Sequence, residues 1–157
     1  MSEQMKLLMR ETIELARHAR ERGNHPFGAL LADADGKILI TAENTVETYH
    51  DITGHAETNL VRNAAKQYPQ DFLAECTLYA STEPCQMCAG AIYWANIRRV
   101  VFGLSQQGLY DLIGGKGDDR LLLSCREVFS HGGKEISVLG PFLEEESRAV
   151  HLGFWDQ

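Results

Sequence analysis

Two short segments, His55-Ala56-Glu57 and Pro84-Cys85-Gln86-Met87-Cys88, form one site only if the fold brings them together. One imidazole and two thiolates supply three zinc ligands and leave the fourth tetrahedral position to water, as in catalytic zinc sites. A bound Zn²⁺ lowers the pKa of water from about 15.7 towards about 7, so that hydroxide is available at neutral pH. A carboxylate two residues from the histidine can then move protons between water and a substrate. We therefore expect Zn²⁺ on His55, Cys85 and Cys88, with Glu57 as the catalytic acid and base.

Helix geometry is consistent with this site. If a helix begins near residue 55, His55 and Glu57 both lie at its first turn. In a second helix from residue 85, Cys85 and Cys88 are one turn apart on the same face. A helix N-terminus stabilises anions and so favours the two thiolates. A structural zinc would need a fourth protein ligand, and no other candidate of suitable type (His25, His50, Cys76 and Cys125) has ligand spacing to the two segments.

Length and composition predict one domain over residues 1–157, large enough to bury a substantial core. Four cysteines, two of them in a C-x-x-C, indicate metal ligands in a reducing compartment. The first residues lack the uninterrupted apolar core of a secretory signal, so we expect a cytoplasmic location. The net charge of −7, from 15 basic and 22 acidic residues, disfavours a protein that holds a nucleic-acid backbone.

Apolar periodicity alternates between the helical and the strand period along the chain. Asp33-Ala34-Asp35-Gly36 is typical of a hairpin turn, and residues 103–117 form a glycine-rich stretch. The alternation predicts an α/β sandwich built on a mixed sheet. We expect helices at 3–22, about 55–67, 85 to about 96, 121–129 and 142–150, and strands at 27–32, 37–42, 76–81, 99–103 and 135–139.

Several segments together resemble the cytidine deaminase-like superfamily. They are His25-Pro26-Phe27-Gly28-Ala29, Asn44, His55-Ala56-Glu57 and residues 81–92, and the similarity covers roughly residues 3–105. Within the superfamily, the chain is similar to the branch of bacterial guanine deaminases, tRNA adenosine deaminases and fungal-type cytosine deaminases. The resemblance implies a three-layer α/β/α sandwich with a central five-stranded mixed sheet, hydrolytic deamination of an aminated base, and a homodimer or higher oligomer.

The resemblance also implies roles for individual residues. Asn44 would bind the base or sugar, the Ala56 backbone N–H would face a substrate carbonyl, and Phe27 would line the pocket. Asn44 holding a turn and Phe27 packing in the core remain open alternatives. Trp94 and Asp119 complete the expected substrate contacts.

Three substrates are compatible with the sequence, and guanine ranks first. Residues 90–95 are similar to the bacterial guanine deaminase stretch, and Asp118-Asp119 follows at the distance of an acidic pair in those enzymes. A tRNA adenosine substrate is favoured by residues 98–103 and opposed by the net charge. Cytosine is favoured by Phe154-Trp155-Asp156, which is similar to the aromatic gate and acidic end of fungal cytosine deaminases. The alternative to an enzyme is a zinc scaffold used for binding.

Overall fold

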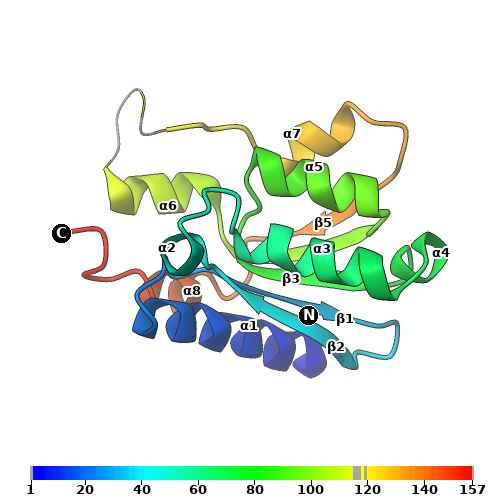
Figure 1. Ribbon diagram of the computed structural model, residues 1–157, viewed down its shortest axis with the longest axis horizontal. Coiled ribbons are helices and arrows are strands. Elements are labelled where there is room, and N and C mark those ends of the chain that lie inside the picture. Colours follow the sequence, from blue (N-terminus) through cyan, green and yellow to red (C-terminus); the bar gives the residue numbers. More distant parts are fainter. Residues whose placement is uncertain (1, 115–117, 119, 157) are drawn as a thin grey trace.

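The computed structural model describes residues 2–114, 118 and 120–156, and this part of the chain contains one five-stranded sheet (Figure 1). The strand order is β2-β1-β3-β4-β5. β1 runs antiparallel to β2 and β3, whereas β3, β4 and β5 are parallel. The predicted five-stranded mixed sheet is confirmed. The strands are β1 (Gly28–Ala32), β2 (Ile38–Glu43), β3 (Thr77–Thr82), β4 (Arg99–Leu104) and β5 (Ser137–Leu139).

Helices cover both faces of the sheet, which makes the predicted three-layer sandwich (Figure 1). α1 and α8 lie on one face, and α3, α5 and α7 lie on the other. The helices are α1 (Glu3–Glu21), α2 (Val46–Tyr49), α3 (Ala56–Gln67), α4 (Gln70–Leu73), α5 (Gln86–Ala95), α6 (Gln106–Ile113), α7 (Cys125–Ser130) and α8 (Glu144–Ala149). Among the described residues, no helix is both long enough and apolar enough to cross a bilayer.

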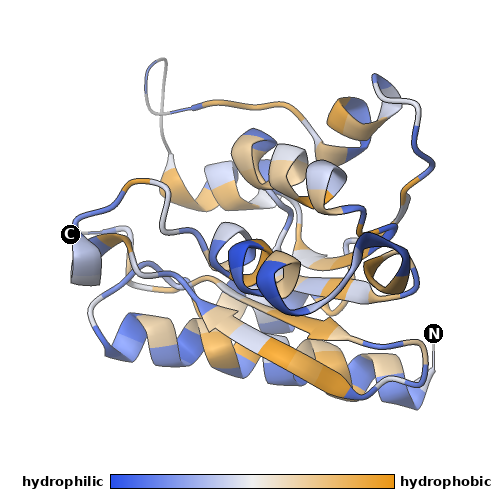
Figure 2. Cartoon of the chain, turned by 45° about the vertical axis from the view of Figure 1, so that its right-hand side comes forward, coloured by the Kyte–Doolittle hydropathy of each residue, from blue (hydrophilic) through white to orange (hydrophobic). Residues whose placement is uncertain are grey.

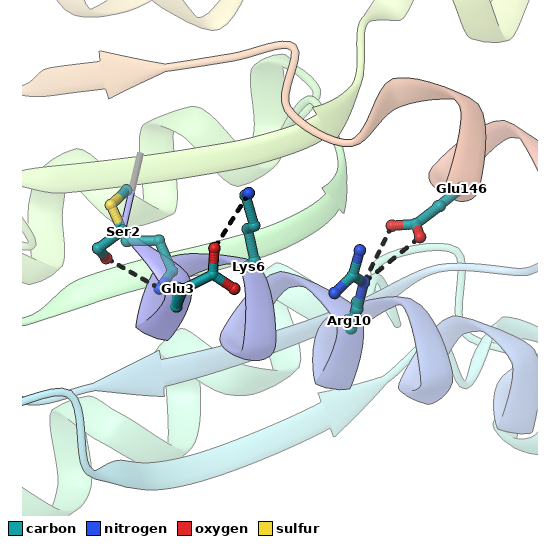
Figure 3. Close-up of polar contacts among 6 residues, drawn as sticks. Ser2, Glu3, Lys6, Arg10 and Glu146 are labelled. Carbon is teal, nitrogen blue, oxygen red and sulfur yellow. Dashed lines mark hydrogen bonds and ion pairs between the residues drawn. The ribbon is translucent and has the colours of Figure 1, made fainter.

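α1 follows directly from its sequence. The Ser2 hydroxyl accepts a hydrogen bond from the Met5 N–H and caps the helix, and Glu3 places a negative charge in the first turn. Its buried residues recur at helical spacing and face the sheet: Leu8, Met9, Thr12, Ile13, Ala16 and Ala19. On the outer side, Arg10 pairs with Glu146 of α8 at 3.3 Å, so the two helices of this layer are also joined by charge (Figure 3).

The central strands are apolar on both faces because helices cover both. In β1, Ala29 and Leu31 contact the core beneath α3 and α5, while Leu30 and Ala32 contact the core beneath α1. Figure 2 shows the strands largely in hydrophobic colours, with the hydrophilic residues on the outer sides of the helices. The uniformly apolar run at residues 28–32 is therefore a doubly covered strand.

The approach of α1 to the start of β1 requires a glycine at position 28. A Cβ at Gly28 would lie 2.6 Å from the Ala16 nitrogen and 2.7 Å from the Thr12 oxygen, both backbone atoms. The Gly28 N–H also donates to the Ser81 hydroxyl at 3.0 Å. This hydrogen bond places Phe27, the preceding residue, at the end of the sheet where β3 ends. At this end of the sheet the chain leaves β3 and continues to Cys85.

Between residues 103 and 130, one helix was not predicted and one predicted helix begins later than expected. The glycine-rich stretch contains a helix, α6, which Ser105 caps by accepting from the Gly108 N–H and which ends at Gly114 with φ of +69°. The helix expected at 121–129 begins only at Cys125, where the Ser124 side chain caps it. Residues 121–123 are extended, and the Gln86 side chain donates to the carbonyls of Leu121 and Leu123.

Candidate zinc centre

The N-termini of two helices meet at the predicted zinc site. His55 is the N-cap residue of α3, and Cys85 is the N-cap residue of α5, with Cys88 in the first turn. β3 ends at Thr82, and Pro84 separates the strand from α5. The contact between α3 and α5 then brings two segments about 30 residues apart into one site.

The spacing of the three donor atoms fits Zn²⁺. The His55 Nδ1 lies 3.5 Å from the Cys85 Sγ and 3.6 Å from the Cys88 Sγ, and all three ligand atoms lie within 4.8 Å of one another. Tetrahedral zinc with bonds of about 2.3 Å to sulfur and about 2.1 Å to nitrogen separates such atoms by about 3.6 Å. The side chains therefore stand at the distances that one tetrahedral ion requires.

The two thiols of the site differ in pKa. Cys88 hydrogen-bonds to Cys85, and this contact, together with His55, lowers the pKa of Cys85 to about 4. The same contact and burial raise the pKa of Cys88, whose sulfur also lies 3.2 Å from the Thr58 hydroxyl. The hydrogen bond to Cys85 raises the pKa of His55. A bound metal ion requires both sulfurs as thiolates and the imidazole neutral, so a cation here would compete with protons for these ligands.

Glu57 lies in the first turn of α3, two residues after His55, and is only 7% exposed. Burial, and next the charge of Cys85, raises its pKa to about 7. A carboxyl group with such a pKa can both give and take a proton near neutral pH, which is the requirement for an acid–base group in catalysis.

A buried carboxylate that sequence reasoning missed fixes the turn before Cys85. Glu83 accepts the backbone N–H of Gln106 at 3.0 Å and that of Cys125 at 2.9 Å, so it binds the first residues of α6 and α7. The Gln106 side chain in turn donates to the Pro84 carbonyl at 3.1 Å. Glu83 stands next to Pro84 in the motif, but its helix partners could not be read from the sequence.

The structure brings three of the predicted substrate residues, Phe27, Asn44 and Ala56, to the same end of the sheet. Asn44 donates its backbone N–H to the Phe27 carbonyl at 3.1 Å, so the two residues are neighbours. The Asn44 side-chain oxygen accepts from the Val46 N–H at 3.0 Å, which makes the turn into α2. Ala56 is buried and begins α3, where backbone N–H groups have no partner within the helix.

The C-terminal segment packs beside this end of the sheet in an aromatic cluster of His25, Phe27, His151, Phe154 and Trp155. The ring of Phe27 meets His151 edge-on at 5.4 Å between centroids, and His25 lies 5.6 Å from Trp155. His151 is 2% exposed, and burial lowers its pKa to about 4. Phe27 was expected near substrate, and Phe154 and Trp155 were expected there only in the cytosine alternative. The places of His25 and His151 in the cluster are additions from the structure.

The last two predicted substrate residues lie apart or outside the described residues. Trp94 follows Cys85 by nine residues along α5, about 14 Å of helix, and is 73% exposed. Its ring packs against Tyr93 and faces Lys134, so the fold does not bring Trp94 to the three zinc ligands. Asp119 lies outside the described residues.

The fold and the three-ligand centre define a zinc-binding deaminase domain. The family model for the cytidine and deoxycytidylate deaminase zinc-binding region matches residues 2–104. The chain belongs to this family, which is one of hydrolytic deaminases. The predicted membership and the predicted zinc cofactor are confirmed.

Relatives with different substrates in their names are similar to the chain. A probable cytosine deaminase of Schizosaccharomyces pombe is 40% identical over 99% of this chain and 95% of its own length. A tRNA-specific adenosine deaminase of Bacillus subtilis is 36% identical over 97% of this chain and 89% of its own. A guanine deaminase of Bacillus subtilis is 46% identical, but over only 49% of each chain. A solved tRNA:A34 deaminase shares the fold with a TM-score of 0.73 and 30% identity over 92% of this chain and 99% of its own.

Proposed function

We propose that the chain hydrolyses the exocyclic amine of a free nucleobase, and that cytosine is the preferred base. The observation that carries this choice is at the C-terminus. The similarity to the probable cytosine deaminase extends over 99% of the chain, and Phe154 and Trp155 pack on His25 and on Phe27, the neighbour of Asn44. An aromatic segment of the same chain at this end of the sheet suits a small planar substrate, which gains from stacking and from exclusion of water.

Each polar group at this end of the sheet has a proposed role. When bound, zinc supplies a hydroxide nucleophile at neutral pH. Glu57 takes the two protons of the attacking water in turn, gives the first to the ring nitrogen of the base and delivers the second to the leaving ammonia. The Asn44 side-chain oxygen already serves the turn, which leaves its amide N–H groups to bind the base. The Ala56 N–H faces the carbonyl oxygen of the base, and Phe27 contacts its ring.

Guanine is the second candidate. The 46% identity to a guanine deaminase supports it over 77 residues, fewer than half of the chain. That similarity does not favour guanine specifically, because the cytosine and tRNA relatives match almost the whole chain. The ranking from sequence, with guanine first, therefore gives way to cytosine.

A tRNA substrate is supported by the similarity to a tRNA-specific adenosine deaminase, which covers 97% of the chain. The net charge of −7 opposes it, because contacts to RNA phosphates come from clustered cations. We retain tRNA as an outcome of the assay.

The test is ammonia release by the zinc-loaded protein from cytosine, guanine and adenine, with an inosine assay on tRNA. We expect turnover of cytosine with a kcat/KM at least about tenfold above that of guanine, and no inosine in tRNA. Guanine as the better substrate would replace cytosine in the proposal. Inosine in tRNA with silence on every free base would contradict a free-base enzyme.

We also propose that the chain forms a homodimer, in which exposed apolar side chains of α5 and the segment after α6 are covered. Met87, Trp94 and Leu121–Leu123 are exposed, and Gln86 ties that segment to α5. Sedimentation of the zinc-loaded protein should give about twice the mass of 17.6 kDa. A monomer at micromolar concentration would contradict this state. A cytoplasmic location stays a proposal, in keeping with four free thiols.

A further inference from the structure

We infer that the chain carries a second ligand site, for a small phosphate-bearing anion, at the end of the sheet opposite the zinc centre. A cavity of about 670 Å³ lies where β4 and β5 begin, next to the segment that joins α7 to β5. Its volume is in the range of small-molecule sites. Figure 1 shows how the chain returns from α7 to β5, which is one of the two edge strands of the sheet.

The cavity is positively charged on an acidic protein. Four cations line it, namely Arg98, Arg99, Arg126 and Lys134, and Glu135 is the one acid among its lining residues. In the described part of the chain, none of these four cations has a carboxylate oxygen within 4.0 Å, whereas Arg10, Arg17, Arg22 and Arg148 do. The four cations therefore outnumber the one acid of the lining, and none of them is ion-paired within the described residues.

Neutral groups nevertheless hold these cations in place. Arg126 donates to the carbonyls of Val138 and Gly140 at 3.2 and 3.1 Å, and its guanidinium lies 5.6 Å from the centre of the Phe102 ring. Arg98 donates through Nε to the Asn96 side chain at 2.8 Å. In both residues, most of the five N–H donors are left for an anion.

Lys134 is held in the same manner, from the other side. Its ammonium donates to the Tyr93 carbonyl at 2.8 Å and lies 4.7 Å from the centre of the Tyr93 ring. The Tyr93 hydroxyl accepts from the Gly133 N–H at 3.1 Å, so α5 fixes the segment that carries Lys134. Cations fixed before binding lose less conformational entropy when a ligand arrives.

This pattern points to phosphate rather than to a carboxylate or a polyanion. Arginine forks match the oxygens of phosphate in pairs, and a doubly charged group gains most from several cations. A single concave site on a chain of charge −7 suits a small ester better than a nucleic-acid backbone, which needs a continuous basic surface.

The site is separate from the chemistry of the zinc centre. Arg99 begins β4 and pairs with Ser137 at the start of β5, while the zinc ligands follow the opposite ends of the parallel strands. The length of β4 alone is about 16 Å. A ligand in this cavity does not reach the zinc ligands, so it is a second site whatever base the enzyme uses.

The test is titration of the zinc-loaded protein with pyrophosphate by calorimetry at constant ionic strength. We expect a Kd of about 1 mM or tighter. Arg98→Gln and Arg126→Gln should each weaken binding at least about tenfold, because each removes a charge-assisted contact. Arg62→Gln is the matched control, because Arg62 is exposed on α3 and donates to the Asn59 side chain. This variant should bind pyrophosphate as tightly as the unchanged protein does.

Circular dichroism identifies a variant that fails to fold, and because Arg126 also holds two carbonyls, Arg98→Gln is the decisive variant. Equal affinity in Arg98→Gln and Arg62→Gln, or no heat with pyrophosphate, would overturn the proposal. So would binding of a short RNA that depends on Arg98 in the absence of pyrophosphate binding, because the ligand would then be a nucleic acid.

Discussion

At the scale of single residues, burial of Glu57 has the largest consequence for chemistry. A carboxyl group in water loses its proton near pH 4.5, and desolvation together with the charge of Cys85 raises the pKa of Glu57 to about 7. Replacing it with glutamine keeps its size and hydrogen bonding but removes proton transfer. Glu57→Gln should therefore retain fold and zinc and lose at least about a hundredfold in rate, measured as ammonia release. Rates near those of the unchanged protein would contradict its role.

The four cysteines divide into ligands and packing residues, and the division can be tested by metal content. Cys88→Ala removes one of three ligands and should lose zinc together with activity. Cys76 is buried away from the site, and burial raises its pKa, so Cys76→Ala should keep one zinc per chain. Atomic absorption on the two purified variants measures the difference. Full zinc occupancy in Cys88→Ala would refute the ligand assignment.

His151 links stability to pH. Trp155 donates its indole N–H to the Nδ1 of His151 at 3.1 Å, so the neutral ring carries its proton on Nε2, 3.4 Å from the Thr82 hydroxyl. Protonation would place a second N–H against the indole, and burial lowers the pKa of His151 from 6.5 to about 4. Between those values the unfolded chain holds a proton that the folded chain lacks, so stability falls as pH falls.

The fall from pH 6.5 to pH 5 should be about 2 kcal/mol larger in the unchanged protein than in His151→Gln, measured by urea unfolding. Glutamine can accept from Trp155 and donate to Thr82 without titrating. His18→Gln, which changes an exposed histidine on α1, is the control and should keep the full dependence. Equal slopes in His151→Gln and His18→Gln would show that His151 is not the source.

At the scale of elements, α1 holds the C-terminal segment. Arg20 donates to the carbonyls of Val150 and Leu152 at 2.8 and 2.7 Å, and its guanidinium lies 5.6 Å from the centre of the Phe154 ring. Arg20→Gln should weaken the packing of this segment by about 1–3 kcal/mol. Arg17→Gln, one turn earlier and paired with Glu14 of the same helix, should not.

Trp155 fluorescence measures that packing, in a Trp94→Phe background that removes the second tryptophan. We expect a red shift and stronger acrylamide quenching in Arg20→Gln, with a higher KM for the base. An unchanged spectrum in Arg20→Gln would mean that the segment holds its place without Arg20.

Two of the helices that form the site could be predicted from local sequence, whereas α6 could not. Residues 55–67 and 85–96 follow from local signals, because the motif residues, Pro84 and apolar periodicity all lie within each segment. α6 could not be predicted in this way, since its glycine at position 108 disfavours a helix in isolation. In the fold, a Cβ at that position would lie 2.7 Å from Leu104, and Glu83 binds the first N–H of α6. These contacts come from residues distant in sequence.

The same reason explains residues 121–124 and the C-terminal cluster. Leu121–Leu123 have helical propensity, but Gln86 and Gln106 bind their backbone groups in an extended form. The residues Phe154 and Trp155 indicated an aromatic C-terminal segment, whereas nothing in the local sequence indicated that His151 would pack against Trp155. The zinc ligands could thus be predicted from the spacing of the motif, whereas the residues proposed to surround the base are brought together by contacts between elements distant in sequence.

At the scale of the whole molecule, the sheet separates two regions of different chemistry. The chain carries a net charge of −7, a zinc centre at one end of the parallel strands, and a basic cavity at the other. A deaminase requires that the zinc centre be catalytic rather than a scaffold for binding.

Removal and return of zinc tests that requirement most directly. The purified protein is stripped with a chelator, and ammonia release from cytosine and guanine is followed as zinc is added back. We predict no release without zinc and a linear recovery that ends at one zinc per chain. Zinc bound at one per chain with no ammonia from either base or from tRNA, or full activity in the stripped protein, would contradict a zinc-dependent deaminase.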